Sequence, residues 1–268
     1  MKKYAGLLKY ELKTLFKDSM TLFMLIYPVM MLFIMGFVLP EILEKTASAD
    51  TNATTYTLLI GFVVVLSIGG FISGAMLGFS LLENKDENTL VNIAVSPITV
   101  TGYTNFKILY TYLIAIMGNF IMVGGLKICA TSKYQIQYMG QTINLLESLG
   151  WGHAWVFILT SSLIVPLFAL VISSIAKNKI EGFAFMKSSG LIIMLPLLTL
   201  LNAFMDWKQY LLGILPNFWT IKPLLNLVLS LDSSSNLPFY GYMIIGGAYA
   251  LGLSLLAYRM FLKRANLK

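Results

Sequence analysis

The chain alternates long apolar blocks with short polar segments. Six blocks hold about twenty or more mostly apolar residues each, the length that a helix needs to cross a bilayer. In lipid the backbone must hydrogen-bond to itself, so these blocks are expected to be helices. The six predicted spans are Met20–Leu39, Tyr56–Leu82, Ile108–Leu126, Ala154–Ala176, Gly182–Met205 and Phe239–Tyr258.

A seventh apolar block, Leu211–Leu231, carries Pro216, Lys222 and Pro223 in its middle. Proline removes a helix hydrogen bond and clashes with the preceding turn. We therefore expect residues 209–231 to form a re-entrant or broken helix on the outer side, which does not cross the membrane.

The distribution of basic residues supports six spans rather than seven. Lys and Arg concentrate on the cytoplasmic side of membrane proteins. With six spans and both termini in the cytoplasm, most of the nineteen Lys and Arg residues lie inside. The exceptions are Lys45, Lys127, Lys133, Lys208 and Lys222. A seventh span would place the basic C-terminus outside.

Composition places the chain in one broad class. It is 57% hydrophobic and only 12% charged, whereas soluble domains average about 25% charged residues. We predict an all-α polytopic membrane protein whose residues 1–268 form a single transmembrane domain. The net charge of +7 fits cytoplasmic loops and anionic lipid rather than nucleic acid. One cysteine and one histidine exclude an internal disulfide and a multi-histidine metal site.

The N-terminal segment, residues 1–18, has the pattern of an interfacial helix. Lys9, Lys13 and Lys17 form a row at intervals of four, and apolar residues recur at helical spacing beside it. Such a helix lies in the headgroup plane. The alternative is a basic flank that only sets the topology. The early charges also argue against a cleavable signal peptide.

The segment 83–100, between the second and third spans, is expected to face the cytoplasm. Acidic residues at Asp86 and Glu87 favour the first turn of a helix. Leu90, Ile93, Ala94 and Pro97 follow at spacings of three and four, and Pro97 ends the pattern. Because so short a helix is unstable alone in water, it must pack against lipid, its own spans or another protein. A plain surface loop is the alternative.

This segment resembles the intracellular loop of ABC-transporter permeases of the type 2 export class. The residues that carry the resemblance are Glu83, Thr89-Leu90, Ser96-Pro97-Ile98, Tyr103 and Lys107. The basic N-terminal helix, the six spans and the interrupted block with Leu215-Pro216 agree with it. The chain departs from the family at Asn88, where glycine is frequent, and asparagine also tolerates turns.

The resemblance implies a coupling helix that docks in a groove of a separate ATPase subunit. The chain has no G-x-x-x-x-G-K-[ST] phosphate loop, so ATP and Mg are expected on that partner and the chain itself is not an enzyme and binds no cofactor. A second permease copy or a paralogue, and membrane lipid, are the other implied partners; nucleic acid is not. The implied location is a bacterial cell membrane. The expected docking residues are Glu83, Asp86, Glu87, Thr89, Leu90, Ile93, Ser96 and Pro97.

Gly70, Gly74 and Gly78 recur every four residues along the second span. Such a ridge lets helices approach closely in lipid. Ordinary packing within one bundle and a moving or dimeric interface explain it equally well.

Other polar residues in or beside the spans have structural explanations as well as functional ones. Lys187 can snorkel to the headgroups, and His153 beside Trp151 suits an interfacial anchor. Asn119 and Asn202 can form interhelical hydrogen bonds or contact a substrate.

Uncharged spans and small outer loops favour hydrophobic or amphipathic cargo, such as a drug, a peptide or a lipid. Three other functions remain open. A channel or secondary carrier needs titratable groups at mid-membrane, and these are scarce here. A membrane enzyme needs clustered His, Asp or Cys residues. A sensor or immunity protein on the same fold is the third alternative.

Overall fold

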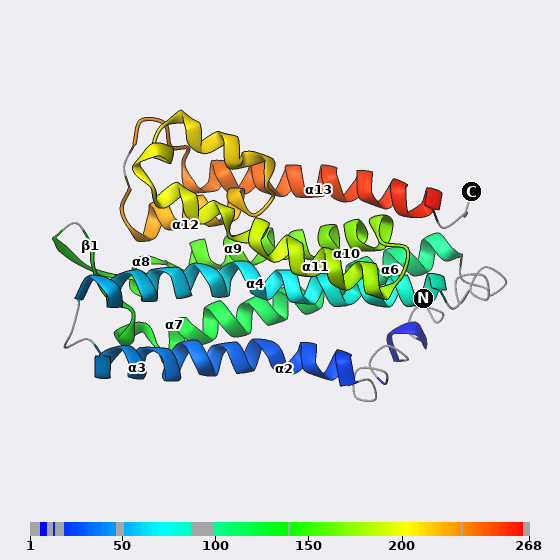
Figure 1. Ribbon diagram of the computed structural model, residues 1–268, viewed down its shortest axis with the longest axis horizontal. Helices are drawn as coiled ribbons and strands as arrows, with labels where there is room; N and C mark the ends of the chain where they lie inside the picture. The colour runs from blue at the N-terminus through cyan, green and yellow to red at the C-terminus, as the bar shows by residue number, and fades with distance from the viewer. Residues whose placement is uncertain are drawn as a thin grey trace.

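The computed structural model describes residues 6–9, 13, 19–46, 51–86, 99–138, 140–231 and 233–264. It is an elongated bundle whose main helices follow the long axis (Figure 1). Among the described residues, five helical stretches are long and apolar enough to cross a membrane. They are Ile26–Lys45, Val100–Cys129, Trp151–Ile175, Ile180–Leu200 and Phe239–Lys263. The prediction of an all-α polytopic membrane protein is confirmed.

Helix α4 (Thr51–Asp86) contains the predicted span Tyr56–Leu82 and is the longest helix, with 36 residues. At 1.5 Å per residue it is about 54 Å long. It lies between α2 on one side and α10 and α11 on the other, and it packs against all three. α4 is therefore the central element of the bundle (Figure 1).

The first span is one continuous helix made of α2 (Ser19–Phe33), a π-helical segment η1 (Ile34–Val38) and α3 (Leu39–Thr46). It extends past the predicted end at Leu39. An exposed i,i+4 ion pair between Glu41 and Lys45, 2.9 Å long, stabilises the helical turns beyond Leu39.

The third helical stretch consists of α6 (Val100–Asn119), the π-helical segment η2 (Phe120–Gly124) and α7 (Gly125–Cys129). α6 begins at Val100 because the Thr99 hydroxyl accepts a hydrogen bond from the Gly102 amide at 3.1 Å. The helix therefore starts well before the predicted boundary at Ile108.

A small β-hairpin follows this stretch. The short helix η3 (Thr131–Lys133) leads into β1 (Gln135–Tyr138), which pairs antiparallel with β2 (Gln141–Asn144). Helix α8 (Leu145–Ser148) comes next. Tyr134 is buried and its hydroxyl donates to the Met35 carbonyl of η1 at 2.7 Å, which anchors the hairpin to the first span.

The fourth predicted span, Ala154–Ala176, is two stacked helices, α9 (Trp151–Ser162) and α10 (Ile164–Ile175), with a break at Leu163. Pro166 has no N–H to give to the Ser162 carbonyl, which explains the break.

The fifth span is helical for a shorter distance than predicted. α11 (Lys179–Met194) gives way to the 3₁₀ helix η4 (Leu195–Leu200), in which Pro196 stands at the start. The short η5 (Asn202–Phe204) follows. The predicted regular helix to Met205 therefore ends at Met194, where proline prevents the α-helical bond pattern.

The apolar block 209–231 is interrupted in the structure. The 3₁₀ helix η6 (Trp207–Ile214) is separated from α12 (Phe218–Val228) by a turn that contains Pro216, whereas Pro223 lies inside α12. The last helix, α13 (Phe239–Arg264), runs the length of the bundle beside α10 and α12.

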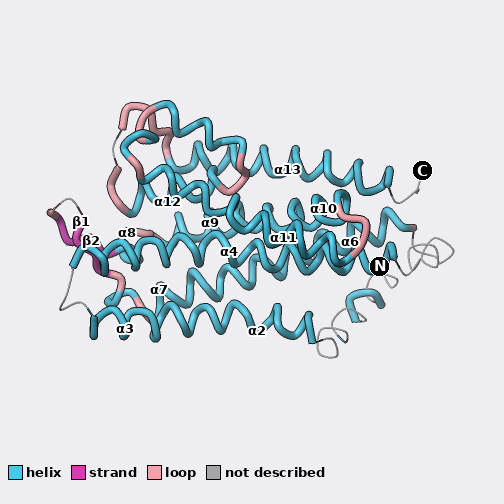
Figure 2. Tube along the Cα trace, in the orientation of Figure 1, coloured by secondary structure: helices cyan, strands magenta, loops and turns pink. Residues whose placement is uncertain are grey.

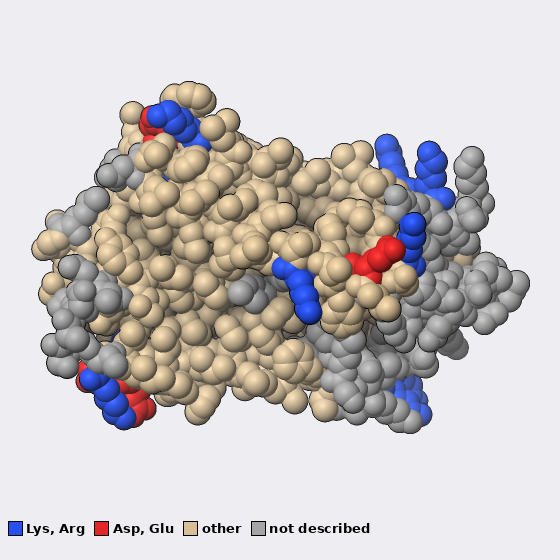
Figure 3. Space-filling view, viewed as in Figure 1, with Lys and Arg blue, Asp and Glu red and all other residues tan. Residues whose placement is uncertain are grey.

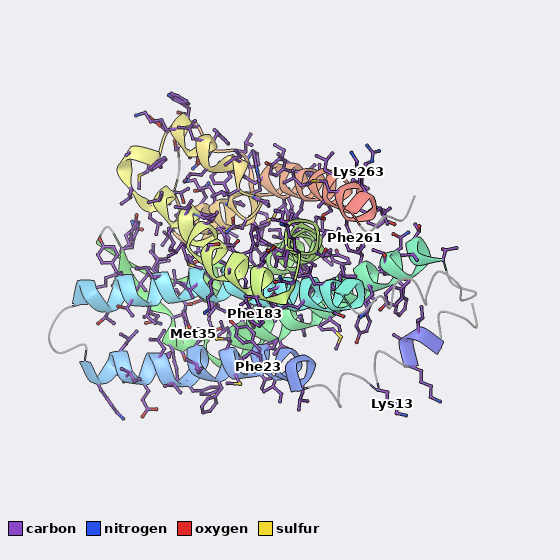
Figure 4. The ribbon with its side chains drawn as sticks, turned by 45° about the vertical axis from the view of Figure 1, so that its right-hand side comes forward. Lys13, Phe23, Met35, Phe183, Phe261 and Lys263 are labelled. Carbon is purple, nitrogen blue, oxygen red and sulfur yellow. The ribbon has the colours of Figure 1, made fainter. Side chains whose placement is uncertain are left out.

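The two ends of the bundle differ in their contents. One end carries residues 6–9, the end of α13, the end of α4 and the start of α6; the other carries the hairpin and α12 (Figures 1 and 2). Lys13 and Lys263 lie at the first of these ends (Figure 4). On the face drawn in Figure 3, acidic and basic side chains gather mainly near the two ends, on either side of a broad uncharged belt. An apolar belt between charged ends is the surface expected of a membrane-spanning bundle.

The predicted interfacial helix, residues 1–18, falls largely outside the described residues. Within it, residues 6–9 are helical and Leu8 is exposed.

Candidate functional site

A polar layer lies inside the bundle, where α4, α6, α9, α10, α11 and α12 converge. It surrounds a cavity of about 20 Å³, room for about one water molecule. Its apolar lining comes from Leu66, Ile164, Phe168, Ile193 and Ile221. The polar lining residues are Ser67, Asn119, Ser161, Asn217 and Thr220.

Asn119 joins α6 to the break between α9 and α10. Its side chain is only 4% exposed, and its Nδ2 donates to the Ser162 hydroxyl at 2.9 Å and to the Ser161 hydroxyl at 3.4 Å. Ser161 and Ser162 are the last residues of α9. Of the two roles predicted for Asn119, the interhelical hydrogen bond is the one that this structure contains.

Asn217 joins the turn before α12 to the end of α11. Its Nδ2 donates to the Ile193 carbonyl at 2.6 Å. Ile193 lies in the last turn of α11, where carbonyls lose their intrahelical donors. The Asn217 side-chain amide therefore supplies a hydrogen-bond donor to a carbonyl at the end of α11. The same bond holds the start of α12 beside the cavity.

Ser67 contributes a hydroxyl group whose hydrogen-bonding capacity is unused. Its hydroxyl oxygen is buried and has no hydrogen-bond partner within the described residues. A buried polar group without a partner is costly. This hydroxyl is therefore free to bond a water molecule or an uncharged polar group that enters the cavity.

The cavity lining contains no charged residue. Proton relays and ion-coupled carriers use ionisable groups inside the membrane, and none of the lining residues can titrate near neutral pH. The layer can thus bind neutral hydrogen-bonding groups, but it is poorly suited to carry protons or ions.

We predict that Asn119→Leu destabilises the protein by about 1 kcal/mol, because the hydrogen bonds to two serine hydroxyls are lost inside the bundle. The thermal unfolding midpoint of the purified protein in detergent measures this effect. Asn105→Leu is the matched control, since Asn105 is an exposed asparagine on the same helix. Equal midpoints for the two variants would contradict the role given to Asn119.

Two of the predicted docking residues, Glu83 and Asp86, lie at the opposite end of α4 from the hairpin (Figure 1). Glu83 and Asp86 belong to α4, and Asp86 is the last residue of α4 that the structure describes. The other predicted docking residues lie outside the described residues: Glu87, Thr89, Leu90, Ile93, Ser96 and Pro97.

Lys107 ties the start of α6 to α4 close to this segment. The side chain is buried, its Nζ donates to the Ser80 hydroxyl at 2.9 Å, and it lies 5.7 Å from the centre of the Tyr103 ring. Ser80 stands one turn before Glu83 on α4. Tyr103 and Lys107 are two of the residues that carry the resemblance to the permease family. The structure brings them together in the first turns of α6, which follows the predicted docking segment.

The glycine ridge of α4 packs within the chain. A Cβ atom on Gly74 would lie 2.7 Å from the Val165 carbonyl oxygen, and one on Gly78 would lie 3.0 Å from the Ile172 Cβ. Both contacts are with α10. The surroundings of the Gly70 side-chain position are not described.

Side-chain contacts extend the packing on both sides of α4. Phe183 of α11 stacks on Phe79 of α4 with ring centres 4.4 Å apart, and Met35 of the first span reaches Gly61 of α4 (Figure 4).

His153 and Lys187 have the surroundings expected of structural residues. The His153 ring packs edge-on against Phe239, with ring centres 4.7 Å apart, and lies parallel to Tyr240. Lys187 is exposed on α11.

A protein-family model described as "Fluoroquinolones export permease protein Rv2686c-like" matches residues 11–258. The match covers both the polar layer and the segment between α4 and α6. The chain belongs to this family of export permeases.

Two curated relatives of this permease come from Mycobacterium tuberculosis. They are the fluoroquinolones export permease proteins MT2760, from strain CDC 1551 / Oshkosh, and Rv2686c, from strain H37Rv. Each is 22% identical to the permease over 255 residues, covering 94% of this chain and 90% of the relative. The resemblance to type 2 ABC permeases is consistent with both findings.

Sequence reasoning missed most of the polar layer of this permease. It selected Asn119 but not Ser67, Ser161 or Asn217, because single Ser and Asn residues are common in membrane helices and their spacing does not show which of them converge. A long polar side chain inside an apolar block was the usable signal, and it selected Asn119, which lines the cavity, together with Asn202, which is not among the lining residues.

Proposed function

We propose that the chain is the membrane-spanning subunit of an ATP-driven exporter of amphipathic drugs. The family match over residues 11–258 is the observation that carries this proposal. Two permease chains would pair, either two copies of this chain or this chain and a paralogue. Each would bind one ATPase subunit, which holds ATP and Mg.

The docking element in this proposal is the segment 83–97. It connects the end of α4 to the start of α6, and these two helix ends lie at the end of the bundle that also carries residues 6–9 and the end of α13 (Figure 1). α4 reaches from there to the polar layer and contacts α2, α6, α10 and α11. A displacement of this segment would therefore be transmitted directly to most of the bundle.

The proposed cargo class follows from the relatives and from the polar layer. The two curated relatives are named as fluoroquinolone exporters. The uncharged polar layer and the apolar bundle suit a flat amphipathic molecule better than an ion. A lipid or an amphipathic peptide is the competing cargo.

Deletion of the chain from its native cell tests the export function. We expect higher steady-state accumulation of a fluorescent fluoroquinolone in the deletion strain, restored to the starting level by the wild-type chain. Unchanged accumulation of several fluoroquinolones would remove this cargo class from the proposal. Screening the same strain with amphipathic peptides and lipid probes would then identify the cargo.

We predict that both termini face the cytoplasm. An epitope tag at the C-terminus should be inaccessible to antibody on intact cells and become accessible after permeabilisation. A tag inserted at the exposed Gly140 turn of the hairpin should be accessible without permeabilisation. A C-terminal tag labelled on intact cells would overturn the predicted topology.

A further inference from the structure

Lys107 is a buried lysine at the end of the bundle where the predicted docking segment begins and ends. It lies two turns into α6 and is 6% exposed. Its Nζ donates to the Ser80 hydroxyl of α4 at 2.9 Å. A hydrogen bond with a charged partner is roughly twice as strong as one between neutral groups. The bond between Lys107 and Ser80 is therefore a strong link between α4 and α6.

The two helices that this link joins are the two that flank the docking segment. α4 continues past Ser80 and is described to Asp86. α6 begins at Val100, two turns before Lys107. The connecting chain limits the separation of the two helix ends only by its own reach. The side-chain bond sets that separation more narrowly, because a hydrogen bond weakens steeply when its atoms move out of line.

Apolar contacts surround this link. Tyr103, one turn before Lys107, is buried, and its ring centre lies 5.7 Å from the Lys107 Nζ. Tyr103 belongs to an apolar cluster that also contains Leu77 and Leu81 of α4 and Phe261 of α13. Burial of apolar surface is not directional. These contacts hold the helices together, whereas the hydrogen bond fixes how far one helix stands along the other.

α6 extends from this link toward the outer end of the bundle. With η2 and α7 it forms the helical stretch Val100–Cys129, which has 30 residues and is about 45 Å long at 1.5 Å per residue. The stretch passes the polar layer at Asn119 and ends near the hairpin (Figure 1). Stiff helices carry displacements between distant sites, so a shift of the first turns of α6 reaches both the polar layer and the outer end.

We propose that Lys107 is a positioning residue that makes α4 and α6 move together when the ATPase subunit displaces the segment 83–97. This inference rests on the proposed function, and it adds the residue through which the displacement enters α6. The link to Ser80 keeps the two helix ends at one spacing, so the motion shifts both helices. Without the link, the helix ends separate and part of the motion is absorbed between them.

Cys129 provides a reporter at the far end of the same helical stretch. It is the single cysteine of the chain and is exposed. The rate at which a maleimide labels Cys129 is measured on the purified full-length permease with its co-purifying ATPase subunit in nanodiscs, with and without ATP and Mg. A Cys129→Ser protein gives the background from the other subunit. We expect ATP and Mg to change the wild-type rate, because they shift the position of α7.

Lys107→Met should remove most of this response while the ATPase subunit stays bound. Methionine has a similar length and lacks the donor, so the fraction of shifted molecules should fall about tenfold, the factor for one hydrogen bond to a charged group. Ser80→Ala removes the acceptor and should also lower the response, whereas Ser80→Thr keeps the hydroxyl and should preserve it. Lys263→Met is the matched control, because Lys263 is an exposed lysine at the same end of the bundle (Figure 4).

The thermal unfolding midpoint separates positioning from stability. A purely structural role predicts that Lys107→Met lowers the midpoint and leaves the response of the folded molecules to ATP unchanged. That result would overturn the proposal. Loss of the ATPase subunit from Lys107→Met, with Lys263→Met still bound, would place Lys107 in the docking surface and would also overturn it.

The wild-type protein distinguishes this inference from the proposed function. A Cys129 labelling rate that ignores ATP, although the ATPase subunit is bound, would refute transmission through α6 and leave the ATP-driven exporter standing. Failure of any ATPase subunit to co-purify with the wild type would refute the ATP-driven exporter and this inference with it.

Discussion

Gly74→Leu is expected to prevent stable folding of the bundle. The position of a Cβ atom at Gly74 is 2.7 Å from the Val165 carbonyl oxygen and 3.1 Å from the Phe168 Cβ, both on α10. The carbonyl is backbone and cannot rotate away as a side chain can. Overpacking a tight contact costs about 1–3 kcal/mol, and here the larger side chain also separates the two helices that form the most extensive contact in the bundle.

The yield of monodisperse protein after detergent extraction, and its thermal unfolding midpoint, measure this effect. Gly252→Leu is the matched control, because a Cβ atom at Gly252 of α13 meets nothing within 4 Å. That variant should keep the wild-type midpoint or exceed it, since glycine costs about 1 kcal/mol in a helix. Wild-type yield and midpoint for Gly74→Leu would show that α4 and α10 do not pack as described.

Leu90→Asp is expected to release the ATPase subunit from the permease. Leu90 belongs to the apolar face predicted for the segment 86–97, and docking would bury it against the partner. Placing a carboxylate in an apolar contact costs several kcal/mol, and a loss of about 3 kcal/mol weakens binding more than about a hundredfold.

Affinity purification from the native membrane in mild detergent, followed by mass spectrometry, measures this loss. The amount of permease in the membrane should stay unchanged. Asn92→Asp is the control, because residue 92 lies on the opposite side of the same predicted helix and should keep the partner bound. A partner recovered equally with Leu90→Asp and with the wild type would show that this segment is not the docking site.

The apolar pattern predicted the existence of the membrane helices better than their ends. The length of an apolar run is imposed by the bilayer, so Phe239–Tyr258 and Ala154–Ala176 correspond closely to α13 and to α9 with α10. Helix ends depend on caps and local contacts that hydropathy does not contain. The Thr99 cap therefore set the start of α6, and Pro196 ended the regular part of α11.

The candidate site was less predictable than the fold because it depends on which side chains converge. Asn119, Ser161 and Asn217 come from three separated segments, and only the packing of α6 and α12 against α9 brings them to one cavity. The π-helical segment η2, which begins directly after Asn119, changes the helix face in a way that no periodicity reveals. The docking segment stays a prediction, since residues 87–98 lie outside the described part of the chain. The resemblance that suggests it lies in a contiguous stretch of sequence, so it can be read without knowing how the helices pack.

ATP-dependent transport by inside-out vesicles from the native membrane tests the central claim most directly. We predict that vesicles with the wild-type chain accumulate a fluorescent fluoroquinolone when ATP and Mg are supplied, and that vesicles with Leu90→Asp do not. Dissipating the proton gradient should leave the accumulation unchanged. Accumulation that needs no ATP and collapses with the proton gradient would contradict the account, and would identify the chain as a secondary carrier.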